Sequence, residues 1–170
     1  DTLNKEAVGR FIELTHEAYK REVGEFFGDV IIGFFTDEPV AIQGGGMRFP
    51  FTTGLFDIFS QRYGYDLRSH ITALVRQEHG YEKVRRDYWM LVTELFKRHC
   101  FGQMAQWCDD HGLKFTGHLL YEEILAGNIQ RNCDMYDMLS EMHVPGIDLL
   151  WGSTSFDDRG TFAPFGGEKC

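Results

Sequence analysis

The sequence predicts an α/β fold in which the strands are parallel and helices connect them. The first observation is a set of short apolar runs without polar alternation, at residues 30–36, 113–120 and 147–151. Such runs are typical of strands that are buried on both faces of a parallel sheet. The second observation is that segments with the three-four apolar spacing of helices separate these runs. This order predicts either an open doubly wound sheet or part of an eight-stranded β/α barrel.

The first elements lead from a helix through a strand into a long loop. Residues 4–23 carry apolar side chains at helical spacing, and Asn4 is placed to cap that helix. The strand at residues 30–36 is too short for an independent helix and is rich in β-branched and aromatic side chains. The segment "VAIQGGGMRFPF" follows, and its glycines and prolines exclude regular structure. A loop of this length within a compact domain is usually functional.

Helices dominate the middle of the chain. Short helices are predicted at residues 54–63 and 66–75, followed by a long helix at residues 81–110 with one apolar stripe. Gly112 provides the stop signal of the long helix. The second strand at residues 113–120 and a helix at residues 133–142 then lead to the third strand.

Three strands are too few to close a barrel, which typically needs about 250 residues. The chain has 170 residues, begins with "DTLNKEAV" rather than with Met, and stops directly after a Gly-rich segment. We therefore expect residues 1–170 to be a single fragment of a larger barrel domain, inactive in isolation. An incomplete parallel sheet leaves unpaired strand edges, and we expect the fragment to self-associate through them.

Charge and cysteine content restrict the partners and the compartment. The formal net charge of −9 argues against nucleic acid or an anionic membrane as a partner, because both require clustered Lys and Arg. The four cysteines include no Cys-x-x-Cys pair, so free thiols are expected. Free thiols favour a reducing compartment such as the cytoplasm, while a longer parent protein in the periplasm or outside the cell is also compatible with the sequence.

Polar side chains gather after the predicted strands, where parallel α/β proteins bind their ligands. They are Asp37 and Glu38 after the first strand, His118, Tyr121, Glu122 and Glu123 on or after the second, and Asp148, Trp151 and Ser153 around the third. Carboxylates supply the acid, base or nucleophile of glycoside hydrolysis, and aromatic faces stack on sugar rings. The pattern therefore favours a carbohydrate substrate, although strand ends also carry charges simply because they meet water.

The pair Asp37 and Glu38 is the candidate for acid catalysis. Adjacent strand residues point to opposite faces, but Pro39 fixes the exit of the chain, so that both carboxylates can approach the cleft. In the alternative interpretation, one carboxylate caps the following segment and the other is solvated. His118 also has two interpretations, as a hydrogen-bonding partner of a sugar hydroxyl or as a satisfied core histidine.

Five segments together resemble the catalytic barrel of the α-L-rhamnosidase-like proteins of glycoside hydrolase family 106 and their bacterial relatives. These segments are "GFFTDEP", "YGYDL", "VRRDYWMLVTELF", "WCDDHGLKFTGHLLYEE" and "MHVPGIDLL". The resemblance covers nearly the whole chain. It implies a (β/α)8 barrel of the TIM type that hydrolyses glycosidic bonds at the carboxyl ends of its strands.

The "DEP" segment is similar to the Asn-Glu-Pro that ends the fourth strand of many barrel glycosidases, where the Glu is the acid. The resemblance implies that Glu38 is the general acid, that Asp37 replaces the usual Asn, and that the partner carboxylate lies on a later strand beyond Cys170. The remaining predicted site residues are assigned to substrate binding. They are Asp37, His118, Tyr121, Glu122, Glu123 and Trp151.

Two other functions remain open from the sequence. One is a carbohydrate-binding or scaffold barrel without catalysis, and the other is a metal-dependent hydrolase that uses Asp37, His118 and Glu122. No metal ligand is assigned, but the resemblance makes calcium a candidate ion, with Asp37, Glu38 or Glu122 as hard oxygen ligands.

Overall fold

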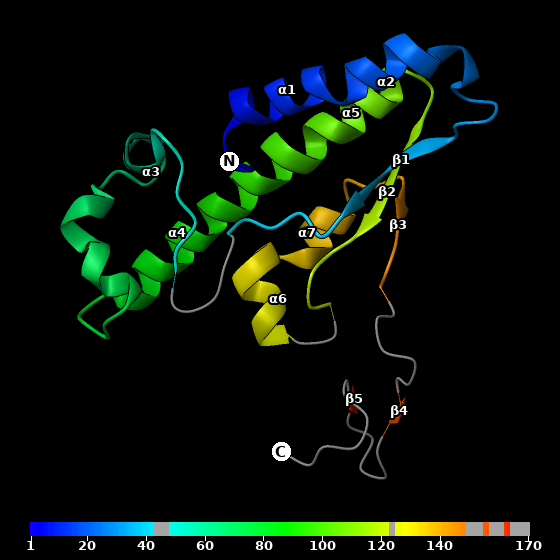
Figure 1. Ribbon diagram of the computed structural model, residues 1–170. Helices are drawn as coiled ribbons and strands as arrows, with labels where there is room; N and C mark the ends of the chain where they lie inside the picture. The colour runs from blue at the N-terminus through cyan, green and yellow to red at the C-terminus, as the bar shows by residue number, and fades with distance from the viewer. Residues whose placement is uncertain (43–47, 123–124, 149–154, 157–161, 164–170) are drawn as a thin grey trace.

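The computed structural model describes residues 1–42, 48–122, 125–148, 155–156 and 162–163. The described chain is an α/β structure with a three-stranded parallel sheet in the order β1-β2-β3 (Figure 1). Its strands are β1 (Gly33–Asp37), β2 (Lys114–His118) and β3 (Val144–Pro145). Two further strands, β4 (Ser155–Phe156) and β5 (Phe162–Ala163), pair antiparallel with each other. The predicted α/β class with parallel strands is confirmed.

Helices precede β1 and fill both connections between the parallel strands. Before β1 lie α1 (Lys5–Leu14), α2 (His16–Val23) and the 3-10 turn η1 (Gly24–Phe26). Between β1 and β2 lie α3 (Leu55–Tyr63), η2 (Leu67–Leu74), α4 (Tyr81–Phe96), η3 (Lys97–Phe101) and α5 (Gly102–Asp110). Between β2 and β3 lie α6 (Leu125–Asn132) and α7 (Met135–Leu139). None of the helices in the described ranges is long and apolar enough to cross a membrane.

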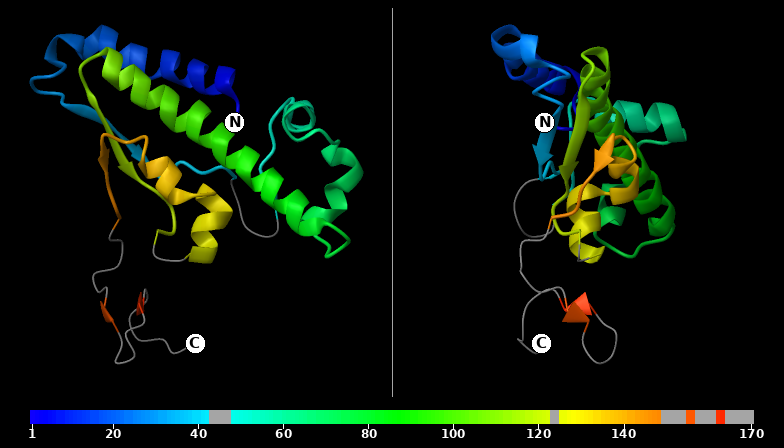
Figure 2. Two further views of the ribbon diagram at one scale, coloured as in Figure 1. Left: turned by 180° about the vertical axis from the view of Figure 1, so that it is seen from behind. Right: turned by 90° about the vertical axis from the view of Figure 1, so that its right-hand side faces the viewer.

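The long helix built from α4, η3 and α5 connects two parts of the molecule. Figure 2 shows α1 and α2 alongside α5, near the sheet, and α3 with η2 beside the start of α4. The sequence predicts one continuous helix over residues 81–110, and the structure interrupts it with a π turn at Lys97–Phe101. The buried stripe continues across this turn, from Leu91 and Leu95 to Met104 and Trp107.

The predicted first helix, residues 4–23, is divided into two helices at Thr15. Asn4 caps α1 as predicted, because its side chain accepts a hydrogen bond from the N–H of Ala7. The hydroxyl of Thr15 donates to the carbonyl of Phe11 at 2.7 Å and also lies 2.8 Å from Nδ1 of His16. A hydroxyl that bonds back to the preceding turn bends a helix, and no Gly or Pro marks this break in the sequence.

One face of the sheet packs against the helices. Phe34 of β1 pairs in register with Phe115 of β2, and both rings lie on this face. The imidazole of His16 stacks on Phe34 with ring centroids 4.6 Å apart, and Trp107 of α5 meets Phe34 edge-on at 5.3 Å. β1, α2 and α5 are therefore joined through one aromatic cluster, which consists of His16, Phe34 and Trp107.

The described residues leave the opposite face of the sheet uncovered. Phe35 on this face is 64% exposed, and four more apolar side chains in and beside the strands are also exposed. They are Val30, Ile32, Val144 and Ile147. The apolar runs of the sequence predict strands buried on both faces, and the described part of the chain buries only one face.

The third strand lies earlier than predicted. The sequence places it at residues 147–151, whereas β3 is Val144–Pro145 and residues 149–151 lie outside the described ranges. Pro145 has no N–H to donate to the ladder. The N–H of His143 donates to the carbonyl of Phe115, and the next bond runs from the N–H of Gly146 to the carbonyl of Gly117. The proline and the glycine read as a loop in the sequence, but an edge strand accommodates both.

The segment between β2 and β3 contains more helix than the sequence predicts. One helix was predicted at residues 133–142, and the structure has α6 before it and the shorter α7 within it. Asp134 caps α7, because its carboxylate accepts hydrogen bonds from the N–H groups of Tyr136 and Asp137. The three described cysteines, Cys100, Cys108 and Cys133, are free, in line with the expected free thiols, and all three are buried.

Candidate functional site

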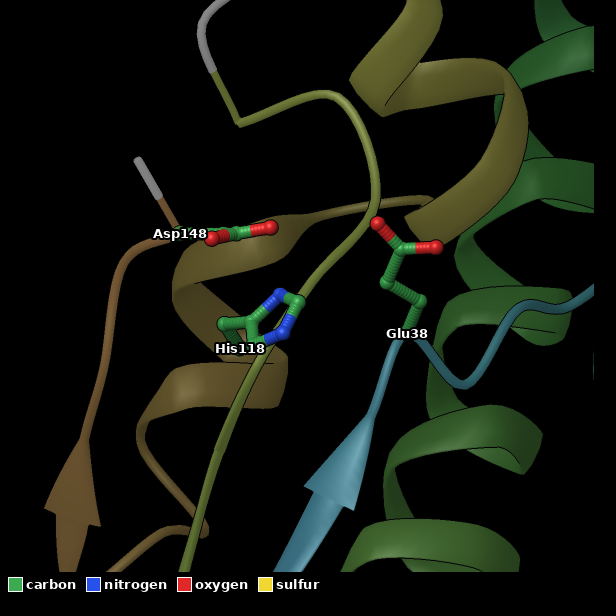
Figure 3. Close-up of side chains that lie close together, drawn as sticks. All are labelled: Glu38, His118 and Asp148. Atoms are coloured by element: carbon green, nitrogen blue, oxygen red, sulfur yellow. The ribbon is translucent and has the colours of Figure 1, made fainter. Parts of the chain in front are cut away.

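The ends of the three parallel strands bring polar side chains together at one edge of the sheet. Asp37 ends β1 and Glu38 follows it, His118 ends β2, and Asp148 lies three residues beyond β3. Figure 3 shows the imidazole of His118 between the carboxyl groups of Glu38 and Asp148. In parallel α/β structures this edge is where ligands bind.

Glu38 reaches this edge through an unusual backbone conformation. Its φ is 46°, in the left-handed region that residues other than Gly rarely adopt. Such a conformation costs on the order of 1 kcal/mol and persists only where the surroundings impose it. Asp37 and Glu38 would point to opposite faces of a regular strand, and the turn at Glu38 allows both to approach His118.

His118 is held by the carboxylate of Asp37. Nε2 of His118 lies 2.9 Å from Oδ1 of Asp37, which is its cross-strand neighbour in the β1–β2 register. The side chain of His118 is 12% exposed, whereas that of Asp37 is 79% exposed. The ring of Phe35 lies beside the imidazole, with centroids 5.6 Å apart. The imidazole therefore has a fixed orientation on the uncovered face of the sheet.

Glu38, His118 and Asp148 form a compact triad. Each offers one ligand atom, and these atoms all lie within 4.8 Å of one another. All three residues are partly buried. Two carboxylates and an imidazole at this separation can hold and transfer protons, or bind a single cation between them.

Glu122 is close to the triad but directs its carboxylate to the backbone. Its Oε1 accepts a hydrogen bond from the N–H of Leu119 at 2.7 Å, and its Oε2 accepts one from the N–H of Asp148 at 2.8 Å. Tyr121 adopts a φ of 60°, and its ring lies against Gly127 of α6. Glu123 and Trp151, the other predicted substrate-binding residues, lie outside the described residues.

Asp148 is a member of the site that the sequence analysis noted but did not assign a role. Its position near a predicted strand was visible, but that strand was placed at residues 147–151, which would have buried the carboxylate within it. Because β3 ends at Pro145, Asp148 lies beyond the strand and beside His118. Asp148 reaches the site because β3 begins three residues earlier in the structure than the sequence predicts.

Comparison with solved structures finds a similar fold in a rhamnosidase from Novosphingobium sp. PP1Y. The TM-score is 0.63 with 22% sequence identity, and the match covers 84% of this chain and 13% of that chain. No protein-family model and no curated protein matches the sequence. The chain therefore spans about an eighth of the length of that rhamnosidase, and what it shares with the matched segment is the fold.

Proposed function

We propose that this chain is part of the catalytic domain of a glycoside hydrolase, a (β/α)8 barrel with α-L-rhamnosidase-like activity, and that Glu38 is its general acid. The observation that carries this proposal is the position of Glu38, which a strained backbone turns towards His118 and Asp148 at the carboxyl edge of the sheet. The fold shared with a rhamnosidase supports the same function.

Glu38 would act by transferring its proton to the glycosidic oxygen. As the bond from the anomeric carbon to that oxygen breaks, the oxygen takes the proton and leaves as an alcohol, while the anomeric carbon forms a bond to water or to the second catalytic carboxylate. His118 and Asp37 would contact sugar hydroxyls beside the cleaved bond. The triad atoms are too close together for a sugar ring to lie between them, so the second catalytic carboxylate belongs elsewhere in the barrel.

The variant Glu38→Gln tests this assignment in the complete protein that contains this chain. We expect turnover of glycosides with poor leaving groups to fall by about 10²- to 10⁴-fold, because the amide N–H is too weakly acidic to protonate the glycosidic oxygen. Glycosides with strongly acidic leaving groups need little protonation, so their turnover should fall far less. Steady-state kinetics on a series of aryl glycosides measures both effects.

The exposed Glu25 in η1, at the other end of β1, provides the matched control as Glu25→Gln. Unchanged turnover of all substrates in Glu38→Gln would remove Glu38 from the chemistry. Binding of glycans by a parent protein that cleaves none of them would instead favour a carbohydrate-binding barrel.

A second candidate function, a metal-dependent hydrolase, is favoured by the triad itself. Two carboxylate oxygens and one imidazole nitrogen within 4.8 Å form a donor set suited to Zn²⁺ or Mn²⁺. Calcium, the ion suggested by the sequence resemblance, prefers oxygen ligands only. In this function Glu38 and Asp148 would be ligands, and Asp37 would orient the imidazole of His118.

Chelation distinguishes the two functions. A metal-dependent enzyme should lose activity in EDTA and regain it with one divalent ion, and Asp37→Asn, which replaces the carboxylate that would orient His118, should weaken binding of that ion about 10- to 100-fold in calorimetric titrations. Activity that is insensitive to EDTA, together with no measurable heat of binding, would exclude this second function.

A further inference from the structure

The loop that follows β2 places a carboxylate between two strand ends. Glu122 is partly buried, and its two oxygens each accept a hydrogen bond from a different backbone N–H group. One donor, Leu119, directly follows His118, and the other is the N–H of Asp148. The same carboxylate therefore bonds the backbone of Asp148 and the backbone of the residue next to His118.

The pairing between β2 and β3 is too short to position Asp148 by itself. The register joins only Thr116 to Val144 and Gly117 to Pro145. The last ladder bond runs from the N–H of Gly146 to the carbonyl of Gly117 at 2.9 Å. Beyond that bond, the carboxylate of Glu122 continues the connection between the two segments, in place of a further backbone pair.

The loop that carries Glu122 is itself fixed at a second point. Nδ2 of Asn132, which is fully buried at the end of α6, donates to the carbonyl of Leu120 at 2.6 Å. The left-handed φ of Tyr121 reverses the chain between this contact and Glu122. The residues that precede Glu122 are therefore joined to α6 by a hydrogen bond of their own.

We propose that Glu122 is a positioning residue, which sets the separation of His118 and Asp148 by bridging the backbone after β2 to the backbone after β3. The catalytic meaning of this role rests on the proposed function, but the bridge itself does not. The sequence predicts a substrate-binding role for Glu122, whereas a bridging carboxylate acts on the substrate only through the residues that it holds.

Substitution of Glu122 should change the two hydrogen bonds in a defined pattern. Glutamine keeps the length of the side chain and one acceptor oxygen, but it presents an N–H₂ group to the second amide, so one bond remains and the other is lost. Alanine removes both acceptors and leaves two N–H groups without their partner. Aspartate is shorter by one methylene group and is expected to reach only one of the two amides.

Amide hydrogen exchange of the complete protein that contains this chain, resolved to single residues by mass spectrometry with electron-transfer fragmentation, tests the bridge directly. In Glu122→Ala we expect exchange at Leu119 and Asp148 to accelerate at least 10-fold, and in Glu122→Gln we expect acceleration at one of them. The N–H of Phe115, which donates to Nδ1 of His143 near the start of β3, serves as the internal reference and should not change. Glu25→Gln serves as the matched surface control.

Unchanged exchange at both Leu119 and Asp148 in Glu122→Ala would overturn the proposal. If that variant does not fold, Glu122→Gln carries the comparison, and equal exchange rates at both amides in the variant and the wild type would overturn it. Acceleration confined to these two amides supports the bridge whether or not the protein hydrolyses glycosides.

The kinetics of the complete protein separate positioning from substrate contact. A positioning role predicts that Glu122→Gln lowers kcat about 10-fold, because displacement of His118 and Asp148 changes the surroundings of the acid Glu38, and that KM changes less, through the displaced His118 contact alone. A rise in KM with unchanged kcat would mean that Glu122 contacts the sugar and would overturn the proposal. Failure of the parent protein to cleave any glycoside would count against the proposed function, and the exchange measurement would still decide the role of Glu122.

Discussion

At the scale of single residues, His16 is a buried titratable group between helices and sheet. Burial lowers the pKa of its imidazole below the ordinary value of 6.5, against the opposing influence of the neighbouring Glu17. The unfolded chain therefore binds a proton at this site more readily than the folded chain. The contribution of His16 to stability is complete above about pH 6.5 and is lost as the pH falls towards the lowered pKa of the folded state.

We predict that His16→Gln reduces the acid sensitivity of the fold. The free energy of unfolding of the wild type should decrease between pH 7 and pH 5 by more than that of the variant, because glutamine does not titrate. Urea denaturation at the two pH values measures the difference. The exposed His79, as His79→Gln, is the control and should leave the pH dependence unchanged.

The site residues show what the sequence reveals at this scale and what it does not. The position of Asp37 and Glu38 at a strand end was predictable, because an apolar run meets two carboxylates and a proline. The φ of 46° at Glu38 was not, since no local pattern favours a left-handed glutamate. The bridge formed by Glu122 was also hidden, because one of its two hydrogen bonds joins it to Asp148, 26 residues away in the sequence.

At the scale of elements, the approach of β1 to β2 depends on a glycine. Gly117 has a φ of +152°, and a Cβ atom added there would lie 2.2 Å from the carbonyl oxygen of Thr36. Gly9 in the middle of α1 has space, since its added Cβ would lie 3.7 Å from Oε1 of Gln103. The same substitution should therefore have opposite effects at the two positions.

We predict that Gly117→Ala lowers the free energy of unfolding by at least about 2 kcal/mol, because the strands must separate to admit the methyl group. Gly9→Ala should raise it by about 0.5 to 1 kcal/mol, because alanine loses less conformational entropy in a helix. Chemical denaturation of the two variants measures both changes. Equal stability of Gly117→Ala and the wild type would contradict the close strand approach.

The sequence predicts elements well where hydrophobic periodicity is strong and poorly where single residues decide. The long helix and the first two strands follow from their apolar patterns. The position of β3 was predicted wrongly because Pro145 and Gly146 are typical loop residues. At the edge of the sheet, however, the strand tolerates a proline without an N–H, and the N–H of Gly146 makes the next bond. α6 was missed because it is polar overall and has Gly127 in its first turn.

At the scale of the whole molecule, the sheet has one covered and one uncovered face within the described residues, and β1 and β3 are its edges. Exposed apolar surface of this kind beside unpaired strand edges favours association. We propose that the isolated chain self-associates through its unpaired strand edges and buries this apolar face in the contact. The missing cover would be the remaining strands of the proposed barrel in the complete protein.

Light scattering across a range of concentrations tests this expectation. The wild-type chain should show an average mass that rises with concentration, and Phe35→Lys should lower it by placing a charge in the apolar face. Met90→Lys, at an exposed position on α4, is the control and should behave like the wild type. A single monomeric species at all concentrations would rule out this association.

The π turn at Lys97–Phe101 is wider than an α-helical turn and therefore contains one additional residue. Each residue of an α-helix advances the side-chain direction by about 100°, so an extra residue without the wider turn would rotate Trp107 away from Phe34. The turn absorbs that residue and keeps the two halves of the helix in phase. This stretch is thus where the helix tolerates a one-residue deletion, such as loss of the exposed Arg98, whereas the same deletion within α5 would put the aromatic cluster out of phase with the sheet.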